Sequence, residues 1–223
     1  MDSWEPKKPP VAGNEHPWRD IDLDVYERHM SDSRVGQLQQ LNLITRDQLA
    51  AYPAASVGVL GVAGGNGLDL IDPGTIDAVF GYDINAEYLA VCQLRYGPVF
   101  GDKLHLIEAS VEGSLAIDRV DLLIANLIIE YVGVDGFAAF AATNAGVIGV
   151  MSCVTQSNHA AGFVSTTDYA SAFDGLGSIS TDVDPEDLNT AMLDAGFLAL
   201  GRIAYPLPNG KTFIRQDYRP TAS

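Results

Sequence analysis

The 223-residue sequence predicts an α/β protein built on a Rossmann-like, doubly wound sheet of seven strands. The sheet is expected to be mostly parallel, with an antiparallel C-terminal hairpin and an N-terminal helical cap. Strand-like and helix-like segments alternate over most of the chain. The strand-like segments are almost continuously apolar, as in parallel sheets that are covered on both faces. Near the C-terminus two such segments follow one another, and Pro208-Asn209-Gly210 between them is typical of a hairpin turn.

The N-terminal quarter precedes the predicted sheet. Residues 1–20 are rich in proline and charge, which predicts a flexible tail. Residues 21–52 are expected to form a helical cap, in which Ser33 is the N-cap of a helix that ends before Pro53. Residues 53–223 are expected to form the core of a single domain.

The core is predicted to contain parallel strands connected by helices. The predicted parallel strands are Ser56 to Val62, Ala78 to Tyr82, Lys103 to Ala109, Val120 to Asn126 and Gly146 to Val154. The predicted helical segments start at Leu68, cover Ala86 to Tyr96 with Asn85 as N-cap, cover residues 130–144, and run from Asp184 and Pro185 to Gly196. The hairpin strands are expected over residues 197–207 and 211–218.

Composition excludes several classes of protein. Thirteen basic and 29 acidic residues give a net charge of −16, which disfavours binding to nucleic acids or anionic membranes. Cys92 and Cys153 lack metal-ligand spacing, and the histidines do not cluster, so no metal site is expected. No apolar run approaches the ~20 residues that cross a bilayer, and the N-terminus lacks the apolar core of a secretion signal. We therefore expect a cytoplasmic protein.

The stretch VLGVAGGNG, from Val59 to Gly67, turns an apolar strand into a glycine-rich bend. In a doubly wound sheet, ligands bind beyond the carboxyl ends of the strands, where small residues let them approach the main chain. A dinucleotide site uses Gly-x-Gly-x-x-Gly, and no frame of this stretch supplies all three glycines.

The glycine-rich stretch resembles the first motif of class I S-adenosylmethionine-dependent methyltransferases, usually a strand followed by an acidic residue and Gly-x-Gly-x-Gly. The resemblance extends over about residues 55–135. It implies S-adenosyl-L-methionine (SAM) as cofactor and S-adenosyl-L-homocysteine (SAH) as product. Ala63, Gly65 and Gly67 correspond to the family's three glycines, which lie under the methionine and ribose, and Gly61 corresponds to the acidic residue.

The resemblance also implies residues that bind the nucleoside. Asp83 ends the second predicted strand, where a carboxylate can accept hydrogen bonds from both ribose hydroxyls. A helix N-cap is the alternative role for Asp83. Ile84 is expected against the adenine, and Ser110 or the backbone of Val111 is expected near its amino group.

In this family the acceptor binds between the N-terminal cap, the loop after the fourth strand and the insertion after the fifth. The resemblance therefore implies that Asn126 lies near the cofactor and that Glu130 and Tyr131 border the acceptor pocket, although first-turn helix positions are the alternative for these two. Further residues expected at the acceptor are Met30, Phe163 and Tyr169.

Tyr26 and His29 are the candidate catalytic residues. Their spacing places them on one side of a helix, and histidine suits proton removal near neutral pH. We hypothesise that His29, oriented or assisted by Tyr26, is the general base; simple packing of the cap is the alternative. His159 is a weaker candidate, and His105 is expected to be structural.

These observations predict SAM-dependent methyl transfer to a small-molecule acceptor by direct in-line displacement, with the methylated atom, N, O or C, left open. A substrate platform and net positive charge, which protein or RNA methylation would favour, are not evident. Two alternatives stay open. One is an NAD-dependent oxidoreductase that uses Asp83 for the ribose. The other is a non-catalytic SAM-binding or interaction protein, an alternative kept open by Gly61 at the acidic position.

Overall fold

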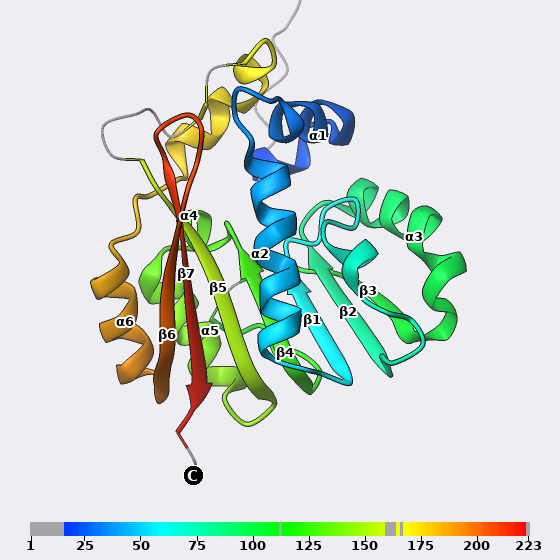
Figure 1. Ribbon diagram of the computed structural model, residues 1–223, viewed down its shortest axis with the longest axis vertical. Coiled ribbons are helices and arrows are strands. Elements are labelled where there is room, and N and C mark those ends of the chain that lie inside the picture. Colours follow the sequence, from blue (N-terminus) through cyan, green and yellow to red (C-terminus); the bar gives the residue numbers. More distant parts are fainter. Residues whose placement is uncertain (1–15, 112, 159–163, 166, 222–223) are drawn as a thin grey trace, which may run out of the picture.

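The fold is a single seven-stranded sheet with helices on both faces (Figure 1). The computed structural model describes residues 16–111, 113–158, 164–165 and 167–221. The strands are β1 Ser56–Leu60, β2 Ala78–Asp83, β3 Leu104–Glu108, β4 Val120–Asn126, β5 Ile148–Ser157, β6 Phe197–Pro206 and β7 Thr212–Pro220. Their order is β3-β2-β1-β4-β5-β7-β6. Strands β1 to β5 pair in parallel, and β7 is antiparallel to both of its neighbours, as predicted.

Helices fill the connections between the strands. The α-helices are α1 Leu23–Ser31, α2 Gln37–Ala51, α3 Ala86–Phe100, α4 Ile129–Val132, α5 Val134–Asn144 and α6 Pro185–Asp194. Shorter 3-10 segments are η1 Pro17–Arg19, η2 Leu68–Leu70, η3 Gly101–Lys103 and η4 Ala170–Ser178.

Two apolar clusters hold the helices to the two faces of the sheet. Leu122 and Leu123 are neighbours in β4, and both are 0% exposed. Leu122 belongs to the cluster that includes Cys92 of α3, whereas Leu123 belongs to the cluster that includes Phe137 of α5. Successive side chains of a strand point to opposite faces, so a sheet covered on both sides needs continuous apolar runs.

The predicted helix caps on the core are confirmed. The side chain of Asn85 accepts hydrogen bonds from the backbone N–H groups of Glu87, at 2.9 Å, and Tyr88, at 3.3 Å, and so starts α3. Asp184 caps α6 in the same way, with Pro185 in the first turn. A capping side chain supplies acceptors for N–H groups that have no partner within the helix.

The predicted cap at Ser33 is wrong. The carboxylate of Asp32 accepts a hydrogen bond from Arg34 N at 2.8 Å, and its carbonyl accepts from the N–H groups of Val35 and Gly36, both at 2.8 Å. These bonds close a turn over residues 32–36, so α2 starts only after Gly36. The segment before the turn forms α1, with Asp22 as N-cap.

Several other boundaries differ from the prediction, and two of these differences are close to the site. The helix predicted over residues 130–144 is interrupted at Gly133, which separates α4 from α5. Strand β5 continues to Ser157, three residues beyond the predicted end at Val154. Both differences lie at the end of the sheet where the site is built.

The N-terminal segment is more closely joined to the core than the predicted tail and cap suggest. Residues 1–15 lie outside the described residues, but Pro17–Arg19 forms η1, and the carbonyl of Trp18 accepts a hydrogen bond from Asn85 Nδ2 at 3.0 Å. In Figure 1, α2 lies against one face of the sheet and runs roughly along the strands, and its buried Ile44 packs with Val154 of β5. Within the described part of the chain, no helix is both long and apolar enough to cross a membrane.

Candidate active site

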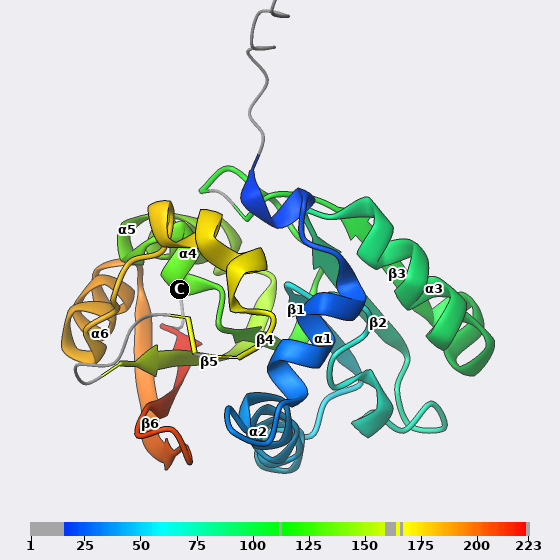
Figure 2. The same cartoon turned by 90° about the horizontal axis from the view of Figure 1, so that it is seen from above.

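A cavity of about 190 Å³ lies at the end of the sheet where β1, β2 and β4 finish. Figure 1 shows α1 and η4 beyond these strand ends, and Figure 2 shows both elements over the sheet in the view from above. Strand ends and their turns form one side of the cavity, and α1, α2, α4 and η4 contribute the rest. This is the crevice where doubly wound sheets bind ligands.

The predicted cofactor residues divide into those that line this cavity and one that does not. Those that line it are Gly61, Ala63, Gly67, Asp83, Ile84, Ser110, Val111 and Asn126. Gly65 lies instead in a separate depression on the outer side of the glycine bend, lined also by Arg95 and Tyr96. The assignment of Gly65 to the cofactor therefore stays a prediction, and the position of Gly65 outside the cavity does not support it.

The glycines of the bend are required by the protein's own packing. Gly61 has a φ of 68°, and a Cβ there would collide with the Ile128 side chain. Gly65 has a φ of 105°, and its Cβ would collide with the ring of Tyr96. Both φ values favour glycine.

Two non-glycine residues beside the cavity have strained backbones. Among the described residues, Ala63 and Leu127 are the non-glycine residues with positive φ, 48° and 57°. Ala63 follows β1, Leu127 follows β4, and both line the cavity. Such strain persists only where the surrounding structure holds it, and it clusters at functional sites.

Asp83 connects the glycine bend to α3. Its Oδ2 accepts a hydrogen bond from Ala63 N at 2.8 Å, and its Oδ1 accepts one from Asn85 N at 2.9 Å. The side chain is 8% exposed, and burial raises its pKa above the ordinary value, against the effect of these hydrogen bonds. Asn85, not Asp83, caps the helix. The backbone of Ile84 also contributes a hydrogen bond to this carboxylate. Because an ionised carboxylate has about four acceptor positions, Asp83 can still accept a hydrogen bond from a ligand.

Asn126 is held by a buried polar network. Its Oδ1 accepts from Gln48 Nε2 at 3.0 Å, and its Nδ2 donates to Thr45 Oγ1 at 3.3 Å. Gln48 Nε2 also donates to Ser152 Oγ at 3.0 Å, and Ser152 donates to Asp217 at 2.5 Å. Helix α2 therefore fixes the amide of Asn126 at the end of β4.

The rest of the cavity is mostly aromatic and apolar. The predicted acceptor-side residues that line it are Tyr26, His29, Met30, Glu130 and Tyr131. The Trp18 ring packs edge-on against Tyr26 and Tyr131, with centroid distances of 5.7 and 5.2 Å. Phe173 of η4 adds a further ring to the lining.

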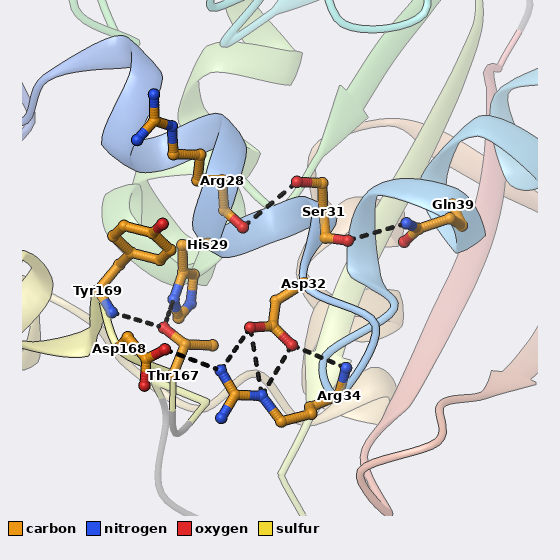
Figure 3. Close-up of polar contacts among 9 residues, drawn as sticks. All are labelled: Arg28, His29, Ser31, Asp32, Arg34, Gln39, Thr167, Asp168 and Tyr169. Atoms are coloured by element: carbon orange, nitrogen blue, oxygen red, sulfur yellow. Dashed lines mark hydrogen bonds and ion pairs between the residues drawn. The ribbon is translucent and has the colours of Figure 1, made fainter.

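His29 is held by the segment before η4 (Figure 3). Its Nδ1 shares a 2.7 Å hydrogen bond with Thr167 Oγ1, which also accepts from Tyr169 N at 3.1 Å. The ring is 4% exposed and lies 4.4 Å from that of Phe173. Burial, then the charge of Lys211, lower the pKa of His29, so it is neutral near pH 7. Thr167 therefore orients His29, in place of the predicted Tyr26.

Figure 3 also shows how α1 meets the segment that carries Thr167. Arg34 pairs with Asp32 at 2.6 Å in the turn after α1 and reaches Asp168 at 3.7 Å. Ser31 Oγ donates to the Arg28 carbonyl at 3.3 Å, and the carbonyl of Ser31 accepts from Gln39 at 3.0 Å. Helix α1 with its following turn and the segment that contains Thr167 and Asp168 thus meet around His29. These two segments, together with η4, are called the lid below.

Tyr26 faces the glycine bend. Asn66 Nδ2 donates to its hydroxyl at 3.1 Å, and its ring stacks on Tyr88. Burial is the main cause that raises the pKa of Tyr26 to about 12. The phenol therefore stays protonated at neutral pH, where it can donate a hydrogen bond.

Glu130 is a buried carboxylate at the start of α4. Its Oε1 accepts a hydrogen bond from Gln156 N at 2.6 Å, and its Oε2 is buried without a hydrogen-bond partner among the described residues. Burial is the main cause that raises the pKa of Glu130 to about 7. The structure therefore brings a titratable group to the part of the cavity that α4 lines.

The remaining predicted residues lie elsewhere. Tyr169 precedes η4 and packs against the apolar cluster that contains Phe173, but it does not line the cavity. Phe163 and His159 lie outside the described residues. His105 is exposed on β3 and stacks on Phe80 with a centroid distance of 4.9 Å, away from the cavity.

Several lining residues were not predicted as site residues. Those with polar groups or rings are His16, Gln37, Asn42, Thr45, Asn66, Tyr82, Tyr88, Gln156, Ser165 and Phe173. Gln156 lies in the part of β5 beyond its predicted end, so recognising the longer strand would have found it. Among the described residues, no group of three or more histidine, cysteine or acidic side chains could hold a metal ion.

The chain has the fold of class I SAM-dependent methyltransferases. Two features of the structure indicate this fold. One is the sheet order β3-β2-β1-β4-β5-β7-β6 with antiparallel β7, and the other is the position of the cavity beyond β1 and β2. The sequence-predicted fold class is therefore confirmed.

Comparisons with solved structures support this class, whereas no protein-family model and no curated protein sequence matches the chain. Magnesium protoporphyrin IX methyltransferase from Synechocystis PCC 6803, crystallised with SAH, superposes with a TM-score of 0.63 at 15% identity, covering 88% of this chain and 93% of that one. The N-methyltransferase NodS from Bradyrhizobium japonicum gives 0.58 at 9% identity, with 82% and 96% covered. The [4+2]-cyclase SpnF gives 0.59 at 10% identity, with 82% of each chain covered.

Proposed function

We propose that this protein binds SAM in the cavity and transfers its methyl group to a small-molecule acceptor by direct in-line displacement. The observation that carries the proposal is the buried carboxylate of Asp83 at the end of β2, which accepts backbone hydrogen bonds from Ala63 and Asn85 beside the strained bend after β1. Ribose hydroxyls are suitable donors for such a carboxylate.

The residues around Asp83 fit an adenosyl group. Ile84, Ser110 and Val111 line the cavity next to the strand ends and would hold the adenine. The main chain at Gly61 and Ala63 would hold the ribose and methionine parts. When bound, SAM would supply a methyl group attached to a positively charged sulfur. The sulfur is the leaving group and keeps both electrons of the carbon–sulfur bond.

The acceptor half of the cavity supports a small, ring-bearing molecule. Rings of Trp18, Tyr131 and Phe173 line it, and Met30 adds a flexible apolar side chain. Enclosing the acceptor between α1, α4 and η4 would orient its reacting atom toward the strand ends and exclude water. His29 is a candidate proton acceptor, since its neutral ring can carry a lone pair on Nε2 when Nδ1 donates to Thr167.

The alternatives have less support. A nicotinamide cofactor is favoured by the all-parallel order 3-2-1-4-5-6, whereas antiparallel β7 lies between β5 and β6 in this sheet. A role without methyl transfer has one specific observation in its favour, because the similar structure of SpnF is described as a cyclase.

Calorimetric titration with SAH and with NAD tests the cofactor. We expect one equivalent of SAH to bind and NAD to give no saturable heat. Saturable binding of NAD without SAH would overturn the proposal. Methyl transfer is then tested with SAM carrying a labelled methyl group and a panel of amines, phenols and acidic carbon compounds. SAH binding without transfer to any of them would favour the non-catalytic alternative.

A further inference from the structure

Glu130 leaves one carboxylate oxygen unsatisfied in an otherwise bonded environment. The side chain is 1% exposed, and Gln156 N donates to Oε1, but Oε2 is buried with no hydrogen-bond partner among the described residues. The carbonyl of Glu130 accepts from Thr181 N at 2.7 Å, which fixes the backbone at this position. A buried acceptor without a donor is costly, so such a group calls for an explanation.

Among the residues that the structure describes, none supplies a cation that compensates the charge of Glu130. The charged and titratable groups that influence it are Asp182, Tyr131 and Cys153, which are acidic or neutral. Among the described residues, no lysine, arginine or histidine forms an ion pair with this carboxylate. A ligand that brings a hydrogen-bond donor would therefore satisfy Oε2 where the protein does not.

The position of Glu130 suits the acceptor. Helix α4 starts directly after β4, and Gln156 lies near the end of β5, so Glu130 joins the ends of two neighbouring strands beside the cavity. The adjoining lining is made of the rings of Tyr131 and Phe173. The cavity thus combines a single unsatisfied acceptor with an apolar wall.

We propose that Glu130 Oε2 binds an N–H or O–H group of the methyl acceptor and takes its proton on transfer. The acceptor is then an amine or hydroxyl compound whose reacting nitrogen or oxygen is attached to a ring or another apolar body. This inference rests on the proposed methyl transfer and narrows its substrate class. It also assigns the proton to Glu130 in place of His29, because Glu130 Oε2 is the buried acceptor that lacks a donor among the described residues.

The proton and electron balance is simple. The lone pair of the acceptor's nitrogen or oxygen forms the new bond to the methyl carbon, and the electrons of the broken carbon–sulfur bond stay on sulfur. The hydrogen of the acceptor atom leaves as a proton to Oε2, and the electron pair that held it stays on the acceptor atom. Glu130 then returns the proton to water.

A binding experiment on the full chain tests this role without knowledge of the natural acceptor. Benzylamine, whose ammonium only donates hydrogen bonds, and benzyl methyl ether, which has no donor, are titrated by NMR into the SAH-bound protein at pH 8. In Glu130→Gln, Oε1 still accepts from Gln156 N, and an amide NH₂ replaces Oε2. We expect benzylamine to bind at least tenfold more weakly to this variant, with the ether unchanged.

A matched control is Thr155→Val. Thr155 Oγ1 is also buried without a partner among the described residues, but Thr155 does not line the cavity. This variant should bind benzylamine like the wild type. Equal benzylamine binding by Glu130→Gln and wild type, including equal failure to bind, would overturn the inference. Failure of the wild type to bind SAH would instead count against the proposed function, so the two are distinguishable.

Discussion

The two halves of the cavity differ in how the chain builds them. The half around Asp83 comes from the ends of β1 and β2, which are close in sequence, and both oxygens of Asp83 have backbone partners. The half around Glu130 comes from α1, α4, the end of β5 and η4, which are far apart in sequence, and it leaves Oε2 without a described partner. The proposed cofactor can thus be bound by a local motif. The proposed acceptor site forms only where segments distant in sequence come together.

The largest expected effect concerns the stability cost of Glu130. The pKa of Glu130 is raised from 4.5 to about 7. Its protonated form therefore contributes stability to the folded protein that is fully present below pH 4.5 and is lost as pH rises through 7. Glu130→Gln removes this titration. Between pH 5 and pH 8 the free energy of unfolding of the variant should therefore rise relative to wild type by about 2–3 kcal/mol. Parallel pH profiles from urea unfolding would show instead that the carboxylate is satisfied.

The second largest expected effect concerns SAH binding in the half of the cavity around Asp83. Asp83→Ala removes two acceptors for the ribose, and we expect SAH binding to weaken by about 1.5–3 kcal/mol. The control is Asp121→Ala, which removes a carboxylate that accepts from Ala55 N and Ser56 N, at 2.9 and 2.8 Å, at the opposite end of β1. The control should lose stability and keep its affinity for SAH. Calorimetry that found equal losses for both variants would contradict a ribose role for Asp83.

A smaller effect separates packing from ligand contact in the glycine bend. Gly65→Ala introduces a Cβ at a φ of 105° and against the Tyr96 ring, outside the cavity. The variant should lose about 1–3 kcal/mol of stability in urea unfolding without any ligand. If stability were unchanged and only SAH affinity fell, Gly65 would belong to the cofactor site, as the sequence suggested.

The smallest effect concerns the lid. Thr167→Val removes the hydrogen bond to His29 Nδ1 but keeps the shape of the side chain. We expect a loss of about 0.5–1.5 kcal/mol in the free energy of unfolding. SAH affinity should stay unchanged because Thr167 does not line the cavity. A loss of SAH affinity would show that the two halves are coupled through the lid.

The difference between features built from neighbouring residues and features built from distant segments also explains what the sequence could predict. Apolar strands such as the one with Leu122 and Leu123, and a local cap such as Asn85, depend on neighbouring residues and were predicted correctly. Ser33 failed as a cap because Asp32 competes for the same backbone groups. The packing of Gly65 was not predicted because its neighbour Tyr96 comes from the next helix. The partner of His29 was not predicted because it comes from a segment more than a hundred residues away.

The most direct test of the central claim is a crystal structure of the protein grown with SAH. The account predicts an adenosyl group beyond the ends of β1 and β2, with both ribose hydroxyls donating to Asp83 and the sulfur directed toward the half that contains Glu130. The account is contradicted if well-ordered crystals show these residues in contact with the protein's own side chains and no nucleoside beside Asp83.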